Sequence, residues 1–116
     1  MTSPSPLRYP GGKKKLTKFI MDAIIENEIQ GGTYVEPFAG GASVALQLLF
    51  SEYVNRIIIN DMDCSIFAFW HSVLFDTEKL CKMIVDTPVN IDEWNKQKDV
   101  QKRSEEHTSE LQSLID

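Results

Sequence analysis

Two short strand candidates, separated by a glycine-rich turn and a helix, constrain the fold of this chain most strongly. The first covers residues 33–36, and the second, residues 56–60, contains three consecutive isoleucines. A continuous apolar run of this length is typical of a strand buried on both faces, as in a parallel sheet. Residues 43–53 between them have the apolar spacing of a helix. The sequence therefore predicts an α/β fold in which 33–36 and 57–60 are adjacent parallel strands.

Helical periodicity accounts for much of the remaining sequence. From Lys13 the apolar residues follow the spacing of one helix face, and Gly31-Gly32 is expected to end this helix. That face consists of Leu16, Phe19, Ile20, Ala23 and Ile24. Three more helices are expected: 64–75 with Asp63 as its cap, 77–86 ended by Thr87-Pro88, and a last one from near Ile91. Trp70 and Trp94 are expected in the core, and His71 is given no role.

Charge and composition exclude several classes of protein. The net charge of −5 argues against a chain whose whole surface binds nucleic acid. No apolar run is long enough to span a membrane, and no apolar segment follows the lysines at 13–15, so we expect a cytoplasmic protein without a secretory signal. The spacing of Cys64 and Cys81 fits neither a zinc site nor a disulfide framework. We therefore expect reduced thiols in buried or half-buried positions, and no metal.

A first polar cluster precedes the first helix, in the segment Arg8-Tyr9-Pro10-Gly11-Gly12-Lys13. Its two glycines let backbone N–H groups approach an anion, and Lys13 adds a positive charge at the start of a helix. The same residues also fit a plain turn followed by solvated lysines, so this cluster alone does not indicate a binding site.

Two further clusters follow the predicted strands. The segment 36–43 (Glu-Pro-Phe-Ala-Gly-Gly-Ala-Ser) lies between a strand and a helix, where α/β sheets bind nucleotide-like ligands. Glu36 is placed there to meet an ammonium group. The segment 60–63 (Asn-Asp-Met-Asp) ends the second strand, where an acid accepts hydrogen bonds from ribose hydroxyls. Taken singly, these segments also fit a tight turn and a helix cap. The three clusters together, in this order and spacing, indicate a binding site far more specifically than any one of them does.

From about Pro6 to the region of Trp94, the chain resembles the N-terminal part of Dam-like adenine-specific DNA methyltransferases. Residues 6–13 (Pro-Leu-Arg-Tyr-Pro-Gly-Gly-Lys) resemble the family's N-terminal cofactor motif, and 36–44 its main S-adenosylmethionine motif. Residues 58–63 (Ile-Ile-Asn-Asp-Met-Asp) resemble its next strand. The resemblance implies the N-terminal part of a Rossmann-like, S-adenosylmethionine-dependent methyltransferase fold, with parallel strands flanked by helices.

The resemblance also implies roles for individual residues. Lys13 would lie near the methionine carboxylate of the cofactor, Glu36 would face its ammonium group, and Asp61 would hold the ribose. Phe38 and the two glycines after Ala39 would line the cofactor, and Met62 would lie beside the adenine. The full set of expected cofactor-binding residues is Tyr9, Gly12, Lys13, Glu36, Phe38, Gly40, Gly41, Asp61 and Met62.

The activity implied is site-specific methylation of adenine N6 in double-stranded DNA, of the kind found in restriction–modification systems. The family's catalytic Asp-Pro-Pro-Tyr segment does not occur in the sequence, and neither does a target-recognition region. No catalytic residue is therefore assigned, and the chain is expected to be truncated before these parts and inactive by itself. The alternative is a cofactor- or nucleotide-binding α/β module without catalysis.

The end of the sequence differs from the rest. Residues 103–116 carry one basic and four acidic side chains, and they resemble translated sequencing-adapter DNA rather than the family. We therefore expect residues 1–102 to form the N-terminal part of a cofactor-binding domain and residues 103–116 to be a non-native tail. A solvated acidic helix is the alternative for this segment.

Overall fold

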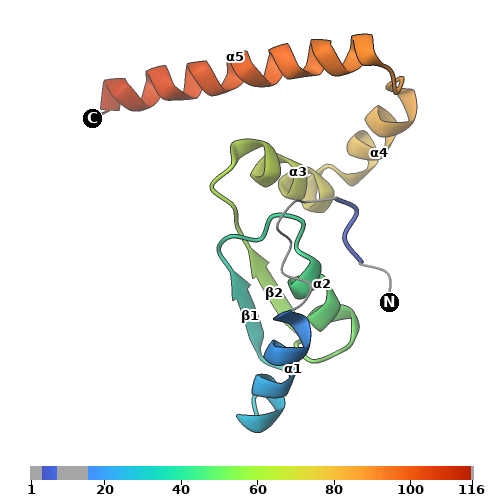
Figure 1. The fold of residues 1–116 in the computed structure, drawn as a ribbon, viewed down its shortest axis with the longest axis vertical. Coiled ribbons are helices and arrows are strands. Elements are labelled where there is room, and N and C mark those ends of the chain that lie inside the picture. The colour runs from blue at the N-terminus through green and yellow to red at the C-terminus, as the bar shows by residue number, and fades with distance from the viewer. Residues whose placement is uncertain (1–3, 8–15, 116) are drawn as a thin grey trace. The chain divides into compact units, whose positions relative to one another are not determined.

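The computed structural model describes residues 4–7 and 16–115, with side chains described as far as residue 105. The chain forms two compact units, Met1–Ile66 and Phe67–Asp116, which we call the N-terminal and C-terminal units. Figure 1 shows the elements in chain order: α1 (Thr17–Glu26), β1 (Thr33–Glu36), α2 (Ser43–Phe50), β2 (Arg56–Ile59), α3 (Cys64–Phe75), α4 (Thr77–Asp86) and α5 (Ile91–Ile115). This is the mixed α/β architecture that the sequence predicts.

Strands β1 and β2 pair in parallel, as predicted (Figure 1). The register places Tyr34 opposite Ile57 and Glu36 opposite Ile59, so the carboxyl ends of both strands lie at the same edge of the sheet. Helix α2 connects them and packs on both strands. The second strand ends one residue earlier than expected, because Asn60 already belongs to the turn that follows it.

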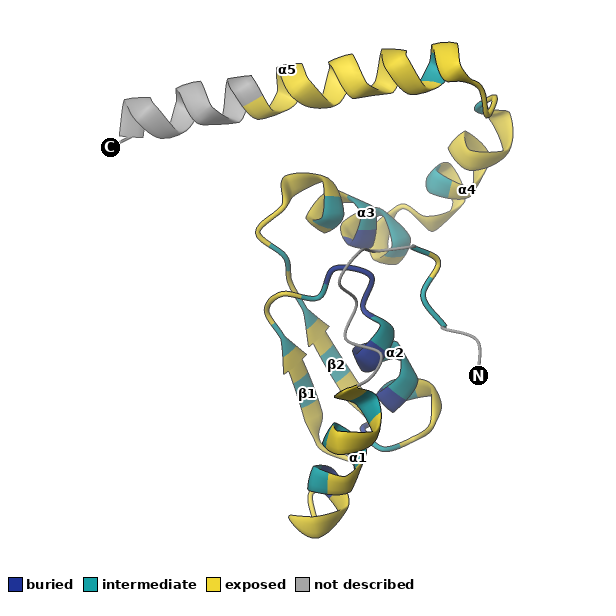
Figure 2. Ribbon diagram, in the orientation of Figure 1, coloured by how far each residue is buried: buried dark blue, intermediate teal, exposed yellow. Residues whose placement is uncertain are grey.

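The core of the N-terminal unit lies on one face of this sheet (Figure 2). Its buried side chains are Ile24 of α1, Val44 and Leu48 of α2, and Val54, with Tyr34 and Ile57 packed against them. The predicted burial of β2 on both faces is wrong, because Ile58 and its neighbour Val35 are exposed on the opposite face. Helices α1 and α2 pack on the face of the sheet that carries Tyr34 and Ile57.

Helix α1 ends before the point that the sequence predicts. It stops at Glu26 rather than at Gly31-Gly32, because Glu28 takes a left-handed conformation with φ of 55°. The amide of Glu28 donates to the carbonyl of Ile25 and that of Ile29 to Ile24, both at 3.1 Å, which is the pairing of a Schellman motif. The apolar face is also narrower than predicted: Ile24 is buried, but Leu16 and Phe19 are exposed.

Helix α2 ends in the same way, at Phe50 instead of residue 53. Glu52 has a left-handed φ of 62°, and its amide donates to the carbonyl of Leu49 at 3.1 Å. The next amide, of Tyr53, donates to Leu48 at 3.0 Å. A side chain in the left-handed region is strained where glycine is not, and a glutamate here also lies at the unfavourable end of the helix dipole.

We expect Glu52→Gly to raise the free energy of unfolding by about 0.5–1 kcal/mol, since glycine removes the left-handed strain at a modest entropic cost. Urea denaturation followed by circular dichroism measures the change. Glu26→Gly is the control, because Glu26 has helical backbone at the end of α1. There glycine is expected to cost about 0.5–1 kcal/mol. Two changes of the same sign would contradict the explanation.

Helices α3 and α4 have the bounds that the sequence predicts, and α5 begins at Ile91 as expected. Trp70 is buried, as predicted. The prediction that Trp94 is buried is wrong, because its ring is exposed on α5 with the Lys98 ammonium 4.8 Å from the ring centroid. Cys64 and Cys81 are free thiols, and both are exposed rather than buried, since Cys64 begins α3 and α4 has no buried residue.

Helix α5 continues without interruption from Lys102 into the segment that the sequence separates as a tail. The side chains that the structure describes in that segment, at residues 103–105, are exposed. The boundary at residue 102 stays a prediction. Within the described part of the chain, no helix combines the length and the apolar character needed to cross a membrane.

Candidate functional site

The two strand-end clusters meet at the carboxyl edge of the sheet. The amide of Asn60 donates to the carbonyl oxygen of Glu36 at 2.9 Å, and the amide of Ala39 donates to the carbonyl of Asn60, also at 2.9 Å. These two bonds continue the parallel pairing past the end of both strands. They hold the turn after β1 directly against the turn after β2, as expected for neighbouring strands of an α/β sheet.

Asp61 ties the two turns together through its side chain. Its Oδ2 accepts a hydrogen bond from the amide of Gly40 at 2.9 Å, and its Oδ1 accepts one from the amide of Asp63 at 2.9 Å. Asp63 has a separate function: its Oδ1 accepts the amide of Ser65 at 2.8 Å and caps α3, as predicted. Asp63 therefore caps α3, whereas Asp61 binds the glycine turn.

The carboxylate of Glu36 is held from both sides. Its Oε2 accepts a hydrogen bond from the Tyr34 hydroxyl at 2.8 Å, and its Oε1 accepts one from the Phe38 amide at 3.3 Å. Burial, together with the hydrogen bond to Glu36 and its negative charge, raises the pKa of Tyr34 to about 12. The tyrosine is therefore protonated, and remains a donor to the carboxylate, throughout the physiological pH range.

We expect Glu36→Ala to lower the pKa of Tyr34 part of the way from about 12 toward its ordinary value of 10.0, because burial, the largest cause, remains. Titration of the ring-carbon NMR signal measures the change. In the unsubstituted chain the raised pKa stabilises the fold below pH ~10, and this contribution is lost as the pH rises toward 12. An unchanged Tyr34 pKa in the variant would show that the carboxylate does not act on it.

The turn between β1 and α2 has an unusual backbone. Gly40 and Ala42 both have left-handed φ angles, 53° and 54°. Gly40, Gly41 and Ala42 are all buried, and Ala42 is the residue that precedes the first turn of α2. Glycine adopts the left-handed conformation freely, so Gly40 suits its position, whereas the methyl group of Ala42 makes that conformation costly.

Two apolar side chains stand exposed beside these polar groups in the sequence. Phe38 is 60% exposed and Met62 is 82% exposed, and they come directly before and after residues that bridge the two turns. Exposed side chains of this size are available to cover the flat ring of a ligand. Of the nine residues expected to bind the cofactor, six lie in this region. The other three, Tyr9, Gly12 and Lys13, lie outside the described residues.

The structure adds residues that sequence reasoning does not identify. Tyr34 supports Glu36, Asn60 joins the turns through its backbone, and Ala39 completes that pairing. Tyr34 carries a usable signal, because residues two apart in a strand share one face, so a tyrosine before a functional glutamate lies within its reach. The backbone roles of Asn60 and Ala39 carry no such signal.

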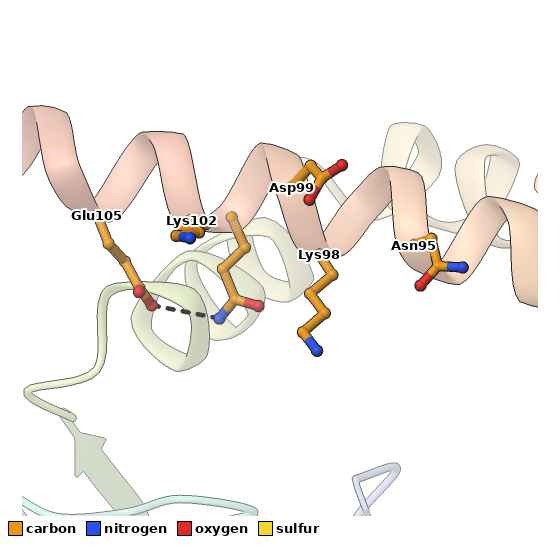
Figure 3. A pocket seen from close by; sticks show the side chains of 6 residues that line it. Asn95, Lys98, Asp99, Lys102 and Glu105 are labelled. Atoms are coloured by element: carbon orange, nitrogen blue, oxygen red, sulfur yellow. Dashed lines mark hydrogen bonds between the residues drawn. The ribbon is translucent and has the colours of Figure 1, made fainter.

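A second candidate is a hollow along α5, in the C-terminal unit (Figure 3). It is lined by Asn95, Lys98, Asp99, Gln101, Lys102 and Glu105, all from one helix. The Lys98 and Asp99 side chains point in opposite directions, and Gln101 Nε2 donates to Glu105 Oε1 at 3.4 Å. These polar groups do not converge on one point. In the part of the chain that the structure covers, no group of three or more His, Cys, Asp and Glu residues is placed to hold a metal ion.

Comparison with known proteins gives two matches of interest. The family model described as D12 class N6 adenine-specific DNA methyltransferase matches residues 9–113. The chain is also 34% identical over 90 residues to the modification methylase StsI of Streptococcus sanguinis. That alignment covers 78% of this chain and 12% of the methylase, so the chain spans about an eighth of that relative's length. No solved structure matches the chain.

Proposed function

Since this chain belongs to the D12 class of N6 adenine-specific DNA methyltransferases, we propose that its strand-end turns form the S-adenosylmethionine site of such an enzyme. The observation that carries the proposal is the 2.9 Å hydrogen bond from the Gly40 amide to Asp61 Oδ2. It brings the glycine turn after β1 and the acid after β2 to one place, at the sheet edge where α/β proteins bind nucleotide-like ligands. We propose a Rossmann-like arrangement for the complete domain.

The acceptors at this edge match the donors of the cofactor. S-adenosylmethionine offers an ammonium group and two ribose hydroxyls, and the site offers the carboxylates of Glu36 and Asp61. A carboxylate has about four acceptor positions, so the two backbone amides on Asp61 leave room for ribose hydroxyls. Charge-assisted bonds of this kind are among the stronger hydrogen bonds. The residues present therefore fit the cofactor.

The other residues complete the proposed site. Gly40 and Gly41 would let the cofactor lie against the backbone, Phe38 would line it, and Met62 would cover the adenine. The N-terminal motif would supply Tyr9, Gly12 and Lys13, with the Lys13 ammonium toward the methionine carboxylate.

When bound, S-adenosylmethionine supplies an activated methyl group on its sulfonium. We propose that the complete enzyme directs this group to adenine N6 in double-stranded DNA, acts in the cytoplasm, and belongs to a restriction–modification system. A modification methylase among its relatives supports this assignment. The part of the reaction that this chain carries out is to hold and orient the cofactor, since positioning supplies much of the rate in group transfer.

We propose that the adenine is held by groups that are not among these 116 residues. Enzymes that modify a base take it out of the helix and grip it with hydrogen bonds and stacking. The Asp-Pro-Pro-Tyr segment expected to do so does not occur in residues 1–116. This favours a second candidate for the chain by itself, a cofactor-binding module without catalysis. The two candidates agree on the site and differ in whether methyl transfer occurs.

Isothermal titration of the 116-residue chain with S-adenosylmethionine, S-adenosylhomocysteine and ATP tests the proposal. We expect both sulfur compounds to bind and ATP not to bind, because Glu36 and Asp61 repel its phosphates. Tritiated S-adenosylmethionine with duplex DNA then separates the candidates, and we expect no transfer by this chain alone. Binding of ATP in preference to S-adenosylmethionine would indicate a nucleotide-binding protein of another class.

A further inference from the structure

We infer that Tyr34 is a positioning residue of this site, whose hydroxyl fixes the Glu36 carboxylate in the orientation that receives the cationic end of the ligand. The inference rests on the proposed function, because it assigns a purpose to the carboxylate's orientation. Tyr34 is not among the residues expected to touch the cofactor. It acts through Glu36, to which its hydroxyl donates at 2.8 Å.

The strand sets up this contact. Tyr34 and Glu36 are two residues apart in β1, so they lie on the same face of the sheet. The ring of Tyr34 packs against the core of Ile24, Val44, Leu48 and Val54, on the side where α2 covers the sheet. The ring is thus anchored in the core, and the hydroxyl, the only polar group of the side chain, reaches the carboxylate at the strand end.

The carboxylate needs such support to act as a preformed receptor. A glutamate side chain has three rotatable bonds, and fixing them on ligand binding costs conformational entropy when the side chain has no support. Here Oε2 is held by Tyr34 and Oε1 by the Phe38 amide, which turns the side chain back over the start of the glycine turn. Part of the ordering cost is therefore met when the protein folds.

The chemical nature of the partner also matters. A tyrosine hydroxyl is a neutral donor, so it orients the carboxylate without cancelling its charge. A lysine or arginine in the same place would cancel that charge. The raised pKa of Tyr34 keeps this donor protonated at every pH in which the protein works. The Glu36 carboxylate is therefore oriented by a neutral donor, and its oxygens can accept further hydrogen bonds, for example from a ligand ammonium.

Two ligands separate this role from a structural one. S-adenosylmethionine carries the amino-acid end that would meet Glu36, whereas 5′-methylthioadenosine has the same adenosine and sulfur without that end. We expect Tyr34→Phe to weaken S-adenosylmethionine binding about three- to tenfold, the effect of one hydrogen bond, and to change 5′-methylthioadenosine binding by less than about twofold. Isothermal titration of the 116-residue chain measures both constants.

Three further variants complete the experiment. Tyr53→Phe is the matched control, because Tyr53 packs on the same core and is not part of the site. It should change neither constant. Glu36→Ala should weaken S-adenosylmethionine selectively, and adding Tyr34→Phe to it should cause no further loss, since the hydroxyl then has no carboxylate to orient. Unfolding curves of all variants show that they fold.

The outcomes distinguish the two proposals. If the unsubstituted chain does not bind S-adenosylmethionine, the proposed function is wrong and the inference falls with it. If the unsubstituted chain binds it and Glu36→Ala binds it equally well, Glu36 does not receive the ammonium group, and the inference alone is overturned. If Glu36→Ala loses affinity but Tyr34→Phe does not, the inference alone is overturned. Equal loss of both ligands in Tyr34→Phe would show a structural role for the hydroxyl and would also overturn it.

Discussion

Leu48→Ala is expected to lower the free energy of unfolding of the N-terminal unit by about 2–5 kcal/mol. Leu48 is fully buried, at 0% exposure, at the centre of the cluster formed with Ile24, Val44 and Val54. Truncating a buried leucine costs about 2–5 kcal/mol, through lost apolar contact and the cavity left behind. Whole domains are stable by only about 5–15 kcal/mol, and small ones lie at the lower end. One substitution therefore removes much of the available stability.

The control for Leu48→Ala is Phe50→Ala, two residues further along α2. It deletes more atoms, but Phe50 is 64% exposed, so the expected cost stays below about 1 kcal/mol. Urea denaturation monitored by circular dichroism compares the two variants. If Phe50→Ala proves as harmful as Leu48→Ala, the stability of this unit does not come from the cluster around Leu48.

Asp61→Ala is expected to weaken S-adenosylmethionine binding by about 1–3 kcal/mol, roughly 5- to 150-fold in Kd. Two effects add. In the proposed site the ribose hydroxyls lose a charged acceptor, and the Gly40 amide loses the bond that holds the glycine turn against the turn after β2. Titration calorimetry measures the affinity, and the unfolding midpoint shows how much the turn itself contributes to stability.

Asp63→Asn is the matched control for Asp61→Ala. It removes one negative charge two positions away and keeps the cap of α3, because asparagine caps helices as well as aspartate does. We expect its affinity for S-adenosylmethionine to stay within about twofold of the unsubstituted chain. Equal losses in the two variants would mean that net charge near β2, and not the position of Asp61, governs binding.

The secondary structure follows from the sequence wherever a strong local signal marks an end. Pro37 closes β1, Asp63 caps α3, and Pro88 keeps the residue before it extended, so these boundaries agree with prediction. The ends of α1 and α2 depend on Glu28 and Glu52 in left-handed conformations. Nothing in a glutamate indicates that conformation, which local residue preferences assign to glycine, and the predicted ends are therefore too late.

The extent of burial is harder to predict than the elements themselves. An apolar run such as Ile57 to Ile59 shows that both faces of the strand are suited to burial. It does not show whether another segment of the chain covers each face. In the structure one face of β2 packs on the core, and Ile58 on the other face is exposed. Burial depends on which other segments pack against a strand, and periodicity carries no information about them.

The candidate site is predictable in outline, and its internal contacts are not. The order of strand, glycine turn, helix and strand indicates that Glu36, Gly40 and Asp61 meet at one sheet edge, and the structure brings them together. Which amide each carboxylate oxygen accepts depends on backbone angles set by the whole unit. The hydrogen bond from Tyr34 to Glu36 is one of these contacts, since the hydroxyl reaches the carboxylate only when the ring packs on the core.

The hydrogen bond between Gly40 and Asp61 joins residues 21 positions apart in the sequence, and this has a consequence for folding. The loop it closes contains α2 and β2, so the proposed binding surface is complete only when both are in place. A ligand that binds only this assembled state adds RT ln(1 + [L]/Kd) to stability, about 2.7 kcal/mol at a hundredfold excess over Kd. The concentration of cofactor would then determine the folded fraction of the chain as well as the fraction that has cofactor bound.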